Sequence, residues 1–115
     1  MTGVWFDPST GGQGLTLFQD GKRLTGSFYT YDLDGLSMWT TFVGEITGGP
    51  VTVDVLAWNG PALDDATWDN SLVEKTIIGS TTFTPSVNSS IVFQYSITLN
   101  GVTVNRTLQL QPFSF

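Results

Sequence analysis

The chain has 115 residues, a net charge of −6, and neither cysteine nor histidine. This length suits one domain that can bury a hydrophobic core without the help of disulfides or structural metals. The absence of Cys and His excludes disulfides, thiolate zinc sites and the commonest general base. The negative charge argues against a nucleic-acid backbone or an anionic membrane surface as a partner, and no apolar run approaches the ~20 residues that span a bilayer.

Alternation of apolar and polar residues indicates strands from end to end, and no segment shows a convincing helical period. Short turn signals such as Asn100-Gly101 link most of these segments. The exception is the acidic segment 62–74, where we expect a short helical turn instead of a strand. The expected strands, in chain order, are 4–7, 15–19, 23–31, 37–46, 51–58, 75–83, 90–99 and 102–110.

Consecutive strands with short links form an antiparallel meander, and eight of them can close into an up-and-down barrel without exposed edges. All five prolines fall in turns or at strand ends, as ladder hydrogen bonding requires. We therefore expect residues 1–115 to form one all-β domain, an eight-stranded antiparallel up-and-down barrel. The alternative is a two-sheet β-sandwich, which usually needs longer crossover connections.

Arg106 is unusual because it shares the inward parity of the valines and leucines in the segment 102–110. A buried guanidinium without a partner is very costly. In a closed barrel the last strand pairs with the first, so Arg106 can stack on Trp5 and form an ion pair with Asp7. We expect these three residues to form a structural clasp. The alternative role for Arg106 is to anchor the carboxylate of a ligand.

The motif Gly3-Val4-Trp5, together with an arginine in the last strand, resembles the barrel-closing signature of the calycin superfamily, the lipocalins and avidins. The segment DGKRLTGSFYT is similar to the second hairpin of avidins. Phe28 stands where avidins have a tyrosine whose hydroxyl helps to hold the ureido oxygen of biotin, and Thr30 replaces a serine. The resemblance therefore implies a barrel without high-affinity biotin binding. Barrels of this size can hold a different small ligand.

The segments GVWFDPSTGGQG and FYTYDLDGLSMW, with Gln19 between them, resemble a family of uncharacterised bacterial β-repeat domains that are often secreted. The resemblance covers the first third of the chain closely and implies no activity. It implies a secreted or cell-surface location as one unit of a larger protein. We expect no signal peptide, since Met1 and Thr2 lead directly into the first strand.

Aromatic and acidic residues predict a binding site at one end of the barrel. Sugar rings stack on flat aromatic faces, and neighbouring carboxylates bond their hydroxyls. We therefore predict that a glycan or another small ligand binds there, through Trp58, Trp68, Tyr31, Asp64 and Asp65. The alternative for Trp68 is a plug over the barrel end or a contact between subunits.

The second hypothesis for function is a structural or self-assembling domain that packs against identical or neighbouring domains. Trp5, Leu17, Phe28 and Trp39 are expected to point into the core. Several other aromatic residues then face outward, and an exposed aromatic stripe favours association into a homo-oligomer. These outward residues are Phe6, Phe18, Tyr29, Tyr31 and Phe42.

Catalysis has few candidate groups in this sequence. A nucleophilic serine or threonine needs a base, and no histidine is present. The segment 62–74 offers oxygen ligands but lacks the spacing of a dedicated calcium loop. We predict a non-enzymatic module with no catalytic residue, metal or cofactor.

Overall fold

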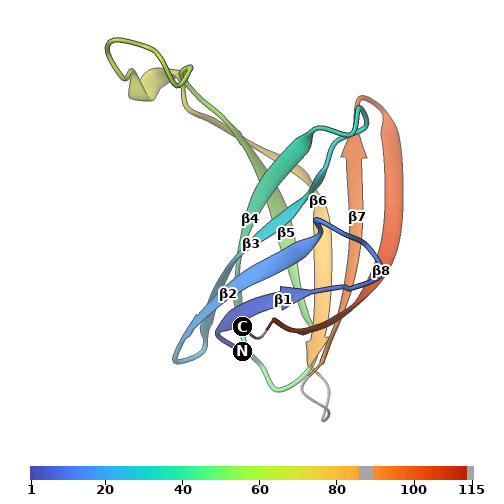
Figure 1. Ribbon diagram of the computed structural model, residues 1–115. Coiled ribbons are helices and arrows are strands. Elements are labelled where there is room, and N and C mark those ends of the chain that lie inside the picture. Colours follow the sequence, from blue (N-terminus) through green and yellow to red (C-terminus); the bar gives the residue numbers. More distant parts are fainter. Residues whose placement is uncertain (86–89, 114–115) are drawn as a thin grey trace.

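The computed structural model describes residues 1–85 and 90–113, and shows a closed barrel of eight antiparallel strands (Figure 1). Each strand pairs with the next one, and the last strand pairs with the first. This topology confirms the predicted all-β up-and-down barrel, and strand boundaries differ from the expected ones by no more than two residues. The strands are β1 (Gly3–Phe6), β2 (Gly14–Asp20), β3 (Arg23–Tyr31), β4 (Ser37–Glu45), β5 (Val51–Asn59), β6 (Glu74–Pro85), β7 (Ile91–Leu99) and β8 (Val102–Pro112).

The core fills the barrel interior with alternate side chains from every strand. Aromatic rings meet at its centre. The ring centroids of Phe28 and Phe93 lie 4.9 Å apart, and those of Phe42 and Phe83 lie 5.5 Å apart. All four phenylalanines are almost completely buried, as is Trp5, which was expected in the core. This packing fills the middle of the barrel.

The expected orientation of β4 is wrong. Trp39, predicted to be in the core, is 53% exposed, and Phe42, predicted to face outward, is 1% exposed. Register explains the reversal, because Trp39 pairs with the outward-facing Tyr29 and directly paired residues share a face. Phe42 pairs with Gly26, and its ring occupies the space that a side chain on Gly26 would need.

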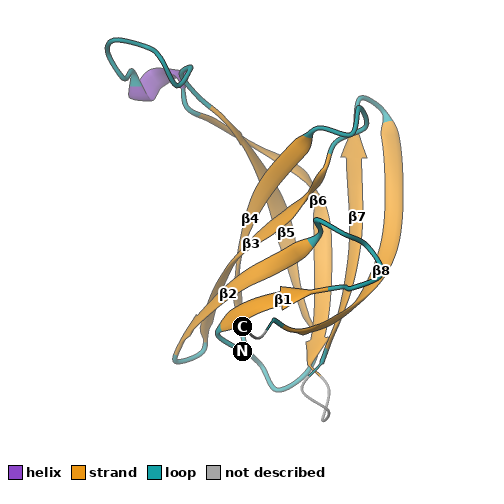
Figure 2. Cartoon of the chain, in the orientation of Figure 1, coloured by secondary structure: helices purple, strands orange, loops and turns teal. Residues whose placement is uncertain are grey.

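The hairpin between β5 and β6 leaves the barrel as a long arm, residues 58–75, as Figure 1 shows. Near the tip of the arm lies the 3-10 turn η1 (Asn70–Leu72), which confirms the predicted helical turn (Figure 2). β4 and β5 pair only at Thr40–Ala57 and Thr41–Leu56, so these two strands diverge where the arm begins. Within the described chain, no helix has the length and apolar character needed to cross a bilayer.

Candidate ligand-binding site

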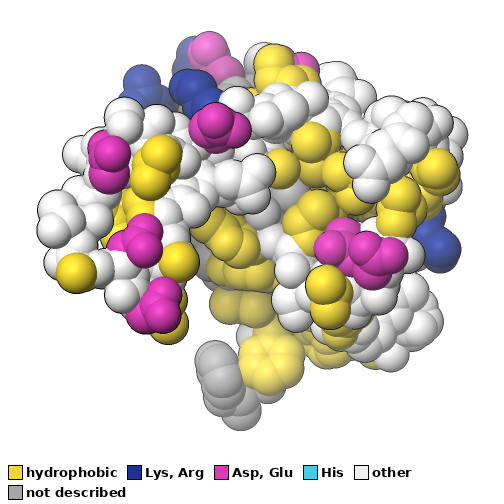
Figure 3. Space-filling view, turned by 90° about the horizontal axis from the view of Figure 1, so that it is seen from above, with side chains coloured by type: hydrophobic (Ala, Val, Ile, Leu, Met, Phe, Trp, Pro, Cys, Tyr) yellow, Lys and Arg dark blue, Asp and Glu magenta, His cyan; other side chains and the backbone are white. Residues whose placement is uncertain are grey.

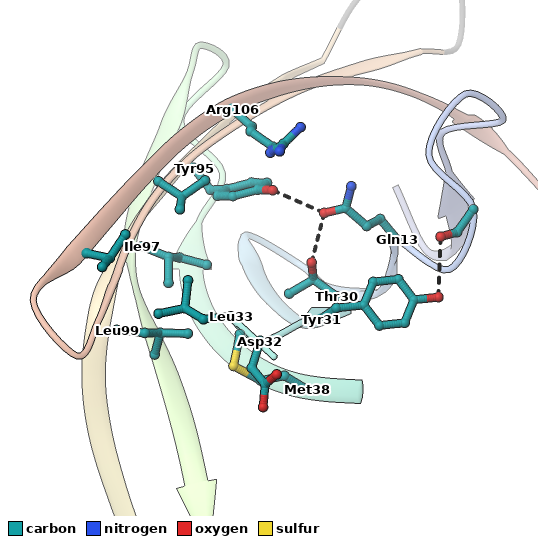
Figure 4. Close-up of a pocket in the computed structure, with 13 residues that line it drawn as sticks. Gln13, Thr30, Tyr31, Asp32, Leu33, Met38, Tyr95, Ile97, Leu99 and Arg106 are labelled. Carbon is teal, nitrogen blue, oxygen red and sulfur yellow. Dashed lines mark hydrogen bonds between the residues drawn. The ribbon is translucent and has the colours of Figure 1, made fainter. Parts of the chain in front are cut away.

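A cavity of about 420 Å³ opens at the barrel end that carries the β3–β4 and β7–β8 turns. It lies beyond Phe28 and Phe93, where the next inward residues on β3 and β7 are Thr30 and Tyr95. One wall is apolar and the other is polar (Figure 4). The apolar wall consists of Leu33, Met38, Ile97, Leu99, Val102 and Val104, and the polar wall consists of Gln13, Thr30, Tyr31, Tyr95 and Arg106. Asp32 also lines the cavity, beside Met38 (Figure 4).

Gln13 is the centre of the polar wall. Its Oε1 accepts hydrogen bonds from Thr30 Oγ1 at 2.8 Å and from the Tyr95 hydroxyl at 3.1 Å. These two bonds use the acceptor capacity of the amide oxygen and fix the orientation of the amide. The two N–H groups on Nε2 make no hydrogen bond within the part of the chain that the structure describes. The amide therefore offers its donors to the cavity.

The loop that carries Gln13 is held over the barrel end by further bonds. The Tyr31 hydroxyl donates to the carbonyl of Gly11 at 3.3 Å, and the Gln13 N–H donates to the carbonyl of Thr10 at 3.2 Å. Tyr31, one of the predicted site residues, thus both lines the cavity and positions the loop. The β1–β2 loop is consequently ordered before any ligand arrives.

Arg106 lies at the rim of the cavity, directly opposite Tyr95 in the β7–β8 register. Arg106 shares the parity of the inward-facing Tyr95, as predicted, because paired residues share a face, but its side chain is exposed to solvent at this end of the barrel. Burial raises the pKa of Tyr95 above its ordinary value of 10.0, while the Arg106 guanidinium and the Thr30 hydroxyl act in the opposite direction. Among the described residues, the Arg106 side chain makes no hydrogen bond or ion pair.

The expected clasp of Trp5, Asp7 and Arg106 does not form in the described structure. Strand β1 meets β8 at Trp5–Pro112, at the far end of β8 from Arg106. The stagger of strands around a barrel shifts this register, and the stagger cannot be read from one strand. Asp7 instead accepts bonds from the Ser9 N–H at 2.8 Å and the Ser9 hydroxyl at 2.6 Å.

The other predicted binding residues lie on the arm, away from the cavity. Trp68 is 61% exposed, and Asp64 and Asp65 are exposed near it in sequence. None of these three lines the mouth cavity, so Trp68 does not plug the barrel end. The structure therefore does not bring Tyr31 together with the acidic residues of the arm.

A second hollow, which we call the outer groove, is lined by Trp58 and by Trp39, which was predicted to lie in the core. The groove has a volume of about 370 Å³ and is lined by Trp39 and Trp58, where β4 and β5 diverge. Trp58 is 36% exposed, and its Nε1 donates to Thr41 Oγ1 at 2.8 Å, which fixes the indole beside β4. Polar side chains at this groove are Asp32, Asp34, Ser37, Asn59 and Asn100.

Seen from above, hydrophobic side chains gather over the barrel end, and acidic side chains lie at several places around them (Figure 3). Across the described ranges, no group of three or more carboxylates is arranged to hold a metal ion. Comparisons with known protein families, with curated proteins and with solved structures found no match to this chain. The resemblance to secreted β-repeat domains stays a prediction, and the functional inference rests on geometry.

Proposed function

We propose that this protein is a non-enzymatic module that binds a small amphipathic ligand in the mouth of its barrel. The observation that carries this proposal is the cavity of about 420 Å³, in which an apolar wall faces polar groups with unused donors. Its volume lies in the range of small-molecule sites, where apolar lining supplies most of the contact and a few polar groups fix orientation.

The chemistry of the polar groups that line the cavity favours binding over catalysis. Asp32 is the only carboxylate among the described residues that line the cavity, and its Oδ1 accepts bonds from the N–H groups of Asp34 and Leu36, both at 2.9 Å. This carboxylate stabilises the β3–β4 turn. A general base needs an available oxygen beside an activated nucleophile, and the cavity lining supplies no such pair.

The proposal is tested by filling the cavity. Met38→Trp places a large ring in the apolar wall, while Val43→Trp adds the same ring to the outer face of the same strand. We expect the fluorescent probe anilinonaphthalene sulfonate to bind the natural protein and the Val43 variant, but not the Met38 variant. Near-UV circular dichroism checks that each variant keeps fixed tertiary packing. Unchanged probe binding by Met38→Trp would contradict the proposal.

Glycan recognition at the outer groove is a second candidate function. It is supported by two exposed indoles, Trp39 and Trp58, beside carboxylate and amide groups that can bond sugar hydroxyls. The test is a glycan array with Trp39→Ala, and Trp68→Ala serves as the control because Trp68 lines neither hollow. Binding that depends on Trp68 instead of Trp39 would exclude this groove.

A structural or self-assembling role is the remaining alternative. The arm supports it, since several large apolar side chains there are exposed to solvent. These are Leu63, Trp68, Leu72 and Val73. A secreted or surface protein with neighbouring domains would offer partners for this arm, and that setting remains a prediction from the resemblance.

A further inference from the structure

We propose that the ligand of the mouth cavity carries a single carboxylate, which binds between the guanidinium of Arg106 and the amide of Gln13. This inference rests on the proposed function of the cavity and names the class of its ligand. Figure 4 shows both groups on the same side of the cavity, with Tyr95 next to them.

The first support is the free charge of Arg106. The chain has 10 acidic residues and only 4 basic ones, yet Arg106 forms no ion pair with any residue that the structure describes. Arg106 pairs with Tyr95 in the β7–β8 register, and this pairing places Arg106 at the rim of the cavity. The side chain is exposed at the rim, and a guanidinium presents five N–H donors and no acceptor, so a ligand group that contacts it has to be an acceptor, preferably an anion.

The second support is the direction of the Gln13 amide. Because Thr30 and Tyr95 both donate to Oε1, the donors that remain on this side chain are those of Nε2. The loop is already held by the Tyr31–Gly11 bond, so little entropy is lost when a ligand accepts from Nε2. A carboxylate has two oxygens in one plane and can accept from the guanidinium and the amide together.

The rest of the cavity defines the body of the ligand. Ile97, Leu99 and Val104 supply an apolar surface beside the polar wall, which suits a hydrocarbon chain or ring. Asp32 lies on the opposite side of the cavity from Arg106 in Figure 4. A second carboxylate at the far end of the ligand would be repelled by Asp32. The site therefore selects monocarboxylates over dicarboxylates.

The experiment compares three probes of equal chain length by calorimetric titration: octanoate, octanol and octanedioate. We expect octanoate to bind about 10- to 100-fold more tightly than octanol, since hydrogen bonds to charged groups are the strong ones. We expect octanedioate to bind more weakly than octanoate. Asp32→Asn, which keeps an acceptor oxygen for the turn, should reduce the difference between the two acids.

Two variants test the proposed contacts. Arg106→Gln and Gln13→Glu should each weaken octanoate binding about 10- to 100-fold and leave octanol binding unchanged. Gln13→Glu removes the Nε2 donors but keeps an acceptor for Thr30 and Tyr95, so the fold is preserved. Arg23→Gln, which removes an exposed arginine at the β2–β3 turn, is the matched control and should change neither affinity.

The outcomes separate the two proposals. Equal binding of octanoate and octanol, or unchanged octanoate binding by Arg106→Gln, overturns the carboxylate inference and leaves the cavity as a ligand site. Failure of all three probes to bind the natural protein overturns both. Tight octanoate binding that is lost in both variants supports both.

Discussion

The Tyr95 hydroxyl on β7 donates a hydrogen bond of 3.1 Å to Gln13 Oε1 in the β1–β2 loop, although 82 positions separate the two residues in the sequence. The same oxygen accepts from Thr30 on β3. One glutamine therefore ties a loop to two strands across the barrel end. It also sets where the packed core stops and the cavity begins.

Removing this acceptor should destabilise the barrel. Gln13→Ala leaves the hydroxyls of Thr30 and Tyr95, both largely buried, without their acceptor. We expect a loss of about 1 kcal/mol in the free energy of unfolding, measured by urea titration. Gln13→Glu keeps the acceptor and should lose less. Equal losses in the two variants would show that the bonds to Oε1 contribute nothing.

The ionisation of Tyr95 should report its distance from Arg106. Burial raises the pKa of Tyr95 and the guanidinium counteracts this rise, so Arg106→Gln should raise the pKa further. Phenolate absorbance in a Tyr29→Phe, Tyr31→Phe background isolates this residue. Because the folded pKa is raised, the stability that neutral Tyr95 gives is complete below pH 10.0 and is lost as pH rises through the folded pKa. A Tyr95 titration unaffected by Arg106→Gln would contradict the described geometry.

Asp7 should contribute stability that disappears in acid. Its bonds from the Ser9 hydroxyl and N–H hold the pKa of Asp7 below its ordinary value of 3.8. The ionised form therefore stabilises the fold above pH 3.8, and this contribution is lost as pH falls through the lowered pKa. Asp7→Ala should cost about 1 kcal/mol at neutral pH, with the gap to the natural protein closing in acid. Asp7→Asn should be intermediate, and a gap independent of pH would refute this account.

A side chain at Gly79 should destabilise the barrel. Gly79 lies on β6 beside a bulge, where Val55 pairs with Gly79 and Leu56 with Ile77, and a Cβ on it would collide with the carbonyl oxygen of Ser96. Gly79→Ala should lower the free energy of unfolding by about 1–3 kcal/mol.

The matched control for Gly79 is Gly49→Ala, since a Cβ at Gly49 meets nothing within 4 Å. We expect its thermal unfolding midpoint to stay close to that of the natural protein. A similar loss in both variants would contradict the close approach of β7 as the cause, since the lower backbone entropy of unfolded alanine favours folding at both positions.

Tryptophan quenching should separate the binding and assembly hypotheses. Trp39, Trp58 and Trp68 are exposed in the single chain, and Trp5 is buried. Acrylamide should therefore quench most of the indole emission at every protein concentration if the domain acts alone. Quenching that appears only on dilution would mean that another copy covers these indoles. Trp68→Phe then shows whether the arm takes part.

The strands were predictable because one face of a strand is buried and the other is exposed to solvent, so apolar and polar residues alternate in the sequence. Strand β4 was oriented wrongly because apolar residues occupy both of its parities, including Trp39 and Phe42. The space above Gly26 decides which of them points inward, and that space belongs to another strand.

The site was harder to predict because its residues depend on contacts distant in sequence. Gln13 lies in a loop without periodicity, and nothing nearby indicates that it meets Tyr95. The inward parity of Arg106 was visible, but its neighbours were not, since they follow from the stagger of the whole barrel. The local sequence pattern therefore predicted the parity of Arg106 but not the residues that lie near its side chain.

The pairing of Trp5 with Pro112 also has a consequence for how the protein is made. Among the eight strands, β1 is synthesised first, and its second neighbour, β8, is synthesised last. Such non-local closure is slow, and until it happens β1 and the newest strand both expose unpaired backbone groups. A nascent chain that stalls before β8 therefore forms an open sheet with two unpaired edge strands, which can pair with strands of other chains.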